Sequence, residues 1–206
     1  MPKKFTDDER NWIRQKLLKE GRRLFAAYGL KKTSIGDLTT AVGVAQGSFY
    51  HFFASKEELY YTLMLEDEKR IRDTILSLFP PNRPVTKEVV AQFLRQSVAM
   101  IEESPLLRSM MAKRELEPLL RKLPTELLQR NFEEDRDALL PLISGWQASG
   151  FMAGERTETI VSMIRALVLL TMHREEIGEV RFPATMELLI DVLAEGMIAK
   201  SRREGE

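Results

Sequence analysis

The chain has 206 residues, contains no cysteine, and balances 31 basic residues with 31 acidic ones. This length is enough to bury the core of one or two domains, and the lack of cysteine excludes disulfides and thiolate-bound metals. The charge is unevenly placed, because residues 1–56 carry 11 Lys and Arg against 5 Asp and Glu, which leaves an equal acidic excess in residues 57–206. A basic end on an acidic body favours a nucleic-acid contact at that end, with ordinary patchiness of charge as the alternative.

Several function classes find no support in the sequence. No apolar run approaches the ~20 residues that cross a bilayer, and no signal peptide is recognisable, so we expect a cytoplasmic protein without membrane contact. The two histidines, His51 and His173, have no acidic residue at the spacing of a helical metal site. Nucleophile-elbow, P-loop and dinucleotide-binding glycine patterns are also missing. We therefore expect no enzyme, no metal and no cofactor, and an enzyme would have to use residues that no pattern groups.

A short basic arm precedes the first expected helix. The arm includes Lys3 and Lys4, which either contact DNA or, as is common at a terminus, have no fixed structure. Thr6 and Glu9 form a capping box that begins the helix, and Gly29 ends it. Apolar residues recur along this helix with helical spacing: Ile13, Leu17, Leu24, Phe25 and Tyr28.

The next stretch predicts two short helices around a tight turn. The first of them carries an apolar stripe of Ile35, Leu38 and Val42. Thr33 or Ser34 can cap its N-terminus. A helix this short needs its neighbours to hold it in place.

Gly43 can supply the left-handed backbone that the turn between these helices needs. In the second helix Phe49 and Phe52 lie three residues apart and are expected to point inward. The opposite face carries no formal charge and consists of small and hydrogen-bonding residues that can approach base edges in a major groove: Ala45, Gln46, Gly47, Ser48, Tyr50 and His51. A capping box of Ser55 and Glu58 then begins the next helix.

The order of glycines, aromatic residues and one lysine in this part of the chain resembles the DNA-binding signature of the TetR family of bacterial one-component regulators. The residues that carry the resemblance are Gly29, Thr33, Ile35, Ala41, Gly43, Val44, Gly47, Phe49, Tyr50, Phe52, Phe53, Lys56 and Leu59. They lie within residues 13–65, about the first third of the chain. The resemblance implies an all-α fold of about nine helices, in which an N-terminal three-helix helix-turn-helix domain precedes a C-terminal helical domain for ligand binding and dimerisation.

Two groups of residues are candidates for DNA contact. Gln46 and Ser48 are candidates for base edges, because an amide can bond adenine in a bidentate manner, and Gly47 allows the backbone to come close. Phosphate contacts are expected from the remaining polar residues and from the start of the third helix: Thr33, Ser34, Tyr50, His51 and Lys56. The resemblance assigns DNA contacts to the positions of Gln46, Tyr50 and Lys56. A packing role is the alternative for Tyr50, and an inert surface position is the alternative for His51.

After the second short helix, which is the expected recognition helix or reading helix, the helical pattern of apolar residues continues as one long helix. Pro80 and Pro81 end this helix. We therefore expect a DNA-binding domain over residues 1–55, a connecting helix over residues 56–79 and a ligand-binding and dimerisation domain over residues 80–206.

Prolines divide the C-terminal domain into further helices. Ser104 and Pro105 predict a helix N-terminus, and Pro118 predicts a break. Pro124 begins a longer helix that contains Pro141, where a kink is expected.

The last two helices are expected over residues 157–175 and 183–201. Apolar side chains cover more than one face of each helix, so each must be covered on two sides. We expect one side to pack on its own domain and the other on a second subunit, which makes a homodimer with two helices from each chain in the interface, as in TetR-like dimers. The twofold axis would place two reading helices on a palindromic site in double-stranded DNA. A central core position in a monomer is the alternative.

By resemblance, the C-terminal domain encloses a pocket for a small, mostly apolar effector. Candidates for its lining are Phe93, Met100, Met110, Met111 and Trp146, with plain core positions as the alternative. The hypothesis is a repressor that the ligand releases from its operator by changing the spacing of the two reading helices. An activator, a ligand-independent DNA-binding protein and a protein-interaction module are the alternatives.

Overall fold

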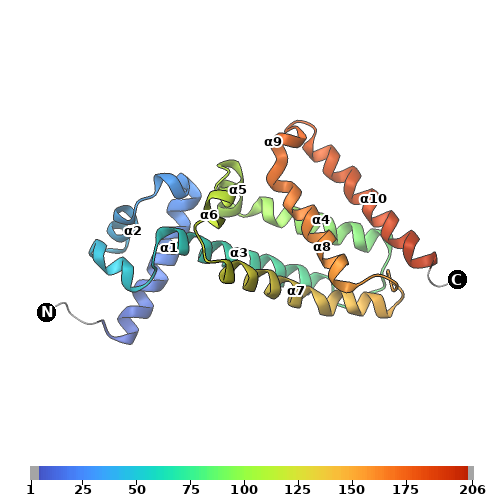
Figure 1. Cartoon of the computed structure of the whole chain (residues 1–206), viewed down its shortest axis with the longest axis horizontal. Helices are drawn as coiled ribbons and strands as arrows, with labels where there is room; N and C mark the ends of the chain where they lie inside the picture. The colour runs from blue at the N-terminus through green and yellow to red at the C-terminus, as the bar shows by residue number, and fades with distance from the viewer. Residues whose placement is uncertain (1–4, 204–206) are drawn as a thin grey trace. The chain divides into compact units, whose positions relative to one another are not determined.

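A computed structural model describes residues 5–203 of the chain, except for the side chains at positions 130–132, 135 and 200–203. Every regular element within these residues is helical, which confirms the predicted all-α fold (Figure 1). The predicted DNA-contacting arm with Lys3 and Lys4 lies outside the described residues.

The chain packs as two compact units. Unit 1 comprises Met1–Glu68 and Ser104–Thr125, and unit 2 comprises Lys69–Glu103 and Glu126–Glu206. The helices of unit 1 are α1 (Asp7–Lys32), α2 (Ile35–Val42), η1 (Gln46–His51), the first part of α3 (Lys56–Leu78), α5 (Pro105–Ala112) and α6 (Leu116–Leu120). Unit 2 contains the rest of α3, α4 (Lys87–Glu103), α7 (Thr125–Ala148), α8 (Thr157–Leu170), η2 (Thr171–His173), α9 (Arg174–Ile177) and α10 (Phe182–Arg203).

The packing division cuts the chain differently from the functional division expected from the sequence. Residues 104–125, which the sequence places in the C-terminal domain, pack with the helices of the DNA-binding region as part of unit 1. The reason is that α5 lies against α1. The assignment of separate functions to residues 1–55, 56–79 and 80–206 stays a prediction.

Local capping signals place the first helices where the sequence predicts them. The Thr6 hydroxyl accepts the N–H of Glu9 at 3.2 Å, and the Glu9 carboxylate accepts the N–H of Thr6 at 2.8 Å, which completes the predicted capping box. Gly29 interrupts the helical backbone of α1 with a φ of 81°. The Ser104 hydroxyl caps α5 by accepting the N–H of Leu107 at 3.3 Å, with Pro105 in the first helical position as predicted.

Two helix predictions in the C-terminal part need correction. The helix expected over residues 157–175 is not continuous, because α8 ends at Leu170 and a short 3-10 helix leads into α9. Pro118 does not interrupt a helix but lies inside the short helix α6, near its start. The first N–H groups of a helix have no hydrogen-bond partner within it, so a proline there removes no helical hydrogen bond. Pro141, by contrast, does lie inside α7 as predicted.

The two units have separate aromatic cores. In unit 1 the rings of Phe25 and Tyr60 meet edge to face, with centroids 4.7 Å apart. In unit 2 a continuous series of edge-to-face contacts at 5.4–5.6 Å joins the buried rings of Phe79, Phe93, Trp146 and Phe151. Such contacts add to the free energy that the burial of each ring contributes. Helix α4 of unit 2 packs against both α8 and α10.

Candidate nucleic-acid interface

Ser34 begins α2 with a complete capping box. Its hydroxyl oxygen accepts the backbone N–H of Asp37 at 3.1 Å and donates to the Asp37 carboxylate at 2.6 Å, and the same carboxylate accepts the N–H of Ser34 at 2.9 Å. The Ser34 hydroxyl bond, followed by the Ser34 N–H bond, holds the pKa of the Asp37 carboxyl below its usual value. The sequence therefore located the start of this helix correctly, with Ser34 rather than Thr33 as the cap.

Gly43 makes the turn that follows α2. Its φ of 83° and ψ of 34° are in the left-handed region, and its N–H reaches the carbonyl oxygen of Thr39 at 2.9 Å. The N–H of Val44 reaches the same carbonyl at 3.0 Å. This geometry confirms the predicted role of Gly43, because a side chain at that position would strain the backbone.

The element expected to read DNA is a 3-10 helix, η1, and not a regular α-helix. Phe49 is its fully buried anchor. Five of the six residues predicted to face outward are exposed, namely Ala45, Gln46, Gly47, Tyr50 and His51, and Ser48 is half-buried. A Cβ atom added at Gly47 would meet nothing within 4 Å, so packing within the chain does not require a glycine there. The small residue instead suits close approach by another molecule.

Phe53, and not Phe52, is the second aromatic residue of this region that points inward. Phe53 is buried and its ring lies 6.0 Å from that of Phe49, whereas Phe52 is half-buried. The prediction assumed that helical spacing continues to Phe52, but η1 ends at His51 and the chain turns there. The ring of Phe52 lies 6.1 Å from that of Phe5, which also contacts His51 edge to face at 6.4 Å.

A shallow hollow of about 450 Å³ gathers four of the predicted DNA-contact residues. Ser34 of the α2 cap, Gln46 and Tyr50 of η1 and Lys56 of α3 all line it. The Tyr50 side chain is 58% exposed. Three separate elements thus present polar groups to one place on the surface of unit 1.

The start of α3 adds the Lys56 ammonium to this hollow. The Ser55 hydroxyl accepts the N–H of Glu58 at 3.1 Å, while the Glu58 carboxylate accepts the N–H of Ala54 at 2.6 Å, one residue earlier than a capping box requires. The Lys56 ammonium donates to the carbonyl oxygens of Leu30 at 2.7 Å and Thr33 at 2.8 Å. An ammonium has three donors, so these two bonds leave one for a phosphate.

Thr33 differs from the other predicted contact residues. Its side chain is buried, and its hydroxyl donates to the carbonyl oxygen of Gly29 at 2.8 Å. It offers no exposed side-chain atom for a phosphate, and we leave it out of the proposed interface.

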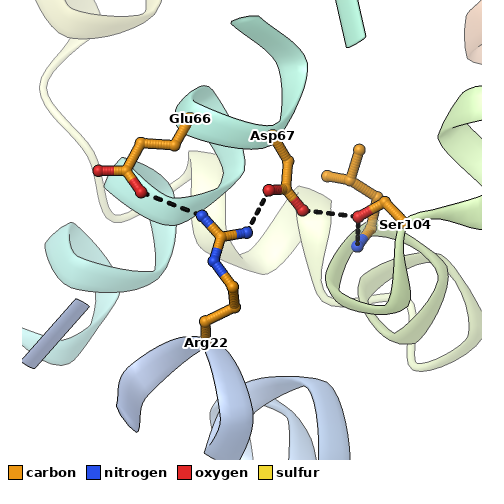
Figure 2. A network of polar contacts seen from close by, with 5 residues as sticks. Arg22, Glu66, Asp67 and Ser104 are labelled. Atoms are coloured by element: carbon orange, nitrogen blue, oxygen red, sulfur yellow. Dashed lines mark hydrogen bonds and ion pairs between the residues drawn. The ribbon is translucent and has the colours of Figure 1, made fainter. Parts of the chain in front are cut away.

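A network of charged and polar groups surrounds the buried Asp67 carboxylate in the same unit. Figure 2 shows Arg22 of α1 between Glu66 and Asp67 of α3, with Ser104 on the far side of Asp67. Arg22 pairs with Asp67, and it bonds Glu66 at 3.0 Å. The Ser104 hydroxyl donates to the Asp67 carboxylate at 2.6 Å. The buried carboxylate therefore ties the cap of α5 to both α1 and α3.

The region of the candidate interface is similar to a known protein family. Residues 17–61 match the family described as bacterial regulatory proteins, tetR family. Over these residues the chain is similar to the DNA-binding domain of the TetR family. The matched residues include α2, η1 and the start of α3.

A curated relative is similar to part of the chain. The HTH-type transcriptional repressor Rv1474c of Mycobacterium tuberculosis is 35% identical over 71 residues, which cover 34% of this chain and 37% of the relative. The match thus spans about a third of the relative's length.

Solved structures extend the likeness to the whole fold. A TetR-family transcriptional regulator from Pectobacterium atrosepticum has a TM-score of 0.74 at 19% identity and covers 94% of this chain and 97% of its own. The transcriptional regulator FadR from Bacillus subtilis, solved in complex with stearoyl-CoA, has a TM-score of 0.60 at 16% identity and covers 90% of this chain and 98% of its own. At these identities the likeness shows the fold alone.

The five residues predicted to line an effector pocket do not fall in one unit of the chain. Met110 and Met111 belong to α5 in unit 1, whereas Phe93, Met100 and Trp146 belong to unit 2. Phe93 and Trp146 are buried against each other as core, and Met100 and Met111 are half-buried. A hollow of about 810 Å³ in unit 2 is lined by other residues: Pro84, Val85, Thr86, Lys87, Glu88, Ser149, Gly150, Phe151, Glu195, Ile198 and Ala199.

Two kinds of feature are absent from the described part of the chain. None of its helices is both long enough and apolar enough to cross a bilayer. Nor do three or more acidic, histidine or cysteine side chains converge there as they would around a metal ion.

Proposed function

We propose that this chain is a cytoplasmic, sequence-specific DNA-binding transcriptional repressor, and not an enzyme, that binds a palindromic operator as a homodimer. The observation that carries the proposal is the hollow that joins Ser34, Gln46, Tyr50 and Lys56 beside the uncharged exposed face of η1. Uncharged polar groups suit base edges, while an ammonium and a helix start suit phosphates.

The residues of the interface have separate roles in this proposal. Gln46 and Ser48 contact base edges, with Ala45 and Gly47 allowing the close approach. Ser34, Tyr50, His51 and Lys56 contact phosphates and fix the register of the protein on the duplex.

Release by a small apolar or amphipathic effector is the second part of the proposal. The support is the shared fold with FadR from Bacillus subtilis, whose structure contains stearoyl-CoA. We propose that the effector favours a dimer whose reading helices no longer match two half-sites one DNA turn, ~34–36 Å, apart. A compound that raises the melting temperature but leaves operator affinity unchanged would argue against release by that compound.

Fluorescence anisotropy tests the DNA-binding role. The probes are duplexes that tile the DNA upstream of the gene for this chain, titrated over a salt series with scrambled duplexes as competitors. We expect one duplex to bind tightly and with strong salt dependence. Gln46→Ala is expected to lose ~1–3 kcal/mol of discrimination against a changed base, and Tyr50→Phe to weaken binding to all duplexes alike.

Tyr28→Ala provides the matched control. Tyr28 is a tyrosine of α1 with 55% of its surface exposed, against 58% for Tyr50, and it does not line the hollow. Binding that is equal for native and scrambled duplexes, or that Gln46→Ala and Tyr28→Ala change equally, would contradict the proposed interface.

A further inference from the structure

Two charged side chains hold the turn between α1 and α2, residues 29–33, from opposite sides. The Glu115 carboxylate accepts the backbone N–H of Leu30 at 3.0 Å and that of Lys31 at 3.3 Å. The Lys56 ammonium donates to the carbonyl oxygens of Leu30 and Thr33. Leu30 therefore has its N–H bound to a carboxylate and its C=O bound to an ammonium. Charge-assisted bonds of this kind are about twice as strong as neutral ones.

Glu115 is set into this position by the residues around it. Its side chain is only 2% exposed, and the buried hydroxyl of Tyr60 donates to its Oε2 at 3.0 Å. Burial, and then the nearby Glu115 carboxylate, raise the pKa of Tyr60 well above its usual value, so the hydroxyl keeps its proton for this bond. Three donors from two other segments of the chain thus converge on one buried carboxylate.

Gly29 makes the approach of this carboxylate possible. A Cβ atom at position 29 would lie 2.7 Å from Glu115 Oε1, and the φ of 81° disfavours any other residue. The glycine that ends the regular part of α1 therefore also makes room for a side chain 86 positions further along the chain.

We propose that Glu115 is a positioning residue for DNA recognition, which acts by fixing the turn that leads into Ser34 and that holds the Lys56 ammonium at the hollow. The inference rests on the proposed function and extends it, because Glu115 lies far outside the matched residues 17–61. Without the carboxylate, the N–H groups of Leu30 and Lys31 lose their buried partner, and the turn populates other conformations. Only the fraction of molecules with the turn in place then binds the operator well.

The sign of the effect separates positioning from simple electrostatics. Glu115→Gln removes a negative charge from the DNA-binding unit, so Coulomb attraction to DNA alone would tighten binding. Positioning predicts the opposite, because the amide group places N–H donors against the N–H of Lys31. We expect operator affinity about tenfold weaker, which corresponds to about one tenth of the molecules in the binding-competent state.

The experiment combines DNA affinity with amide hydrogen exchange of the free protein. The duplex is the one that the wild-type chain binds best among those upstream of its own gene, and both measurements are made well below the melting temperature of every variant. We expect Glu115→Gln to speed exchange at Leu30 and Lys31 selectively and to weaken binding. Glu115→Asp keeps the charge but is one methylene too short to bond both amides, so it is expected to change exchange and affinity in the same direction.

Lys122→Met is the control for general loosening of residues 104–125. It removes the exposed ion pair of Lys122 with Glu57, 2.7 Å long, that ties this segment to α3, and it leaves the bonds of Glu115 intact. We expect amide exchange at Leu30 and Lys31 to stay at the wild-type value. Unchanged exchange at Leu30 and Lys31 in both Glu115 variants, or affinity that rises in Glu115→Gln, would overturn the proposal.

The same experiment keeps the two proposals apart. If the wild-type chain prefers no duplex, the proposed function fails, while the exchange rates still decide whether Glu115 holds the turn. If Glu115→Gln does not fold, Glu115→Asp and Tyr60→Phe provide the test, because Tyr60→Phe removes one of the three donors and is expected to speed exchange at Leu30 and Lys31 by a smaller factor. If exchange at Leu30 and Lys31 stays at the wild-type rate in both of these variants, the inference is contradicted.

Discussion

At the residue scale, the fold requires a glycine at position 29 but not at position 47. Alanine variants at the two positions test this difference. Gly29 has a positive φ, and a Cβ there would lie 2.7 Å from both Glu115 Oε1 and Lys113 Cδ. We expect Gly29→Ala to lower the free energy of unfolding by ~1–3 kcal/mol, measured by denaturant titration. Gly47→Ala is the control, because a Cβ there meets nothing and the change should be within ~0.5 kcal/mol. Equal losses of stability would contradict this distinction.

The residues also show which parts of the site the sequence could predict. Ser34, Gly43 and the Thr6 cap were predictable because each acts on backbone groups within a few positions of itself. Glu115 was not, because its partners Leu30 and Lys31 lie 85 and 84 positions away and its own neighbourhood shows no pattern. No local signal distinguishes a carboxylate that will be buried from one that will be solvated.

At the element scale, the capping box of α2 predicts a pH-dependent contribution to stability. The Ser34 hydroxyl bond lowers the pKa of Asp37 in the folded chain below its usual 3.8. A carboxyl with a lowered folded pKa stabilises the fold above its unfolded pKa and loses that contribution as the pH falls through the folded value. Asp37→Asn should therefore melt at a lower temperature than the wild type at neutral pH, and the difference should shrink as the pH falls below 3.8. A difference that is constant with pH would show that the charge is not involved.

Elements with strong local signals were predicted better than elements shaped by packing. The start of α2 and the N-cap of α5 follow from short motifs. The 3-10 form of η1 does not, because this element has no side-chain cap and its buried residue, Phe49, packs against parts of the chain that no short motif specifies. For the same reason the sequence predicted Phe52 to point inward, whereas Phe53 is the buried residue.

At the scale of the whole molecule, the proposed homodimer depends on an uncharged stripe of α10. Glu187, Asp191 and Glu195 form one row along this helix and pair with Arg95 and Lys87 of α4. The adjoining row is uncharged and exposed, namely Leu188, Val192, Gly196 and Ala199. The same uncharged stripe on a second copy of the chain can pack against it, so the two stripes form a twofold interface. The small residues Gly196 and Ala199 at one end of the stripe allow the two helices to approach closely.

A double variant tests this stripe. Leu188 and Val192 are 67% and 59% exposed, so Leu188→Glu with Val192→Glu should cost the monomer little stability while placing four like charges in a twofold interface. We expect light scattering to give twice 23.8 kDa for the wild type and 23.8 kDa for the double variant. Operator affinity should fall with the loss of the dimer, because one reading element then engages one half-site. Val180→Glu is the control, since Val180 is 95% exposed and precedes α10, and it should stay dimeric. A wild-type chain of monomer mass that still prefers its operator would contradict the dimer and leave the reading element intact.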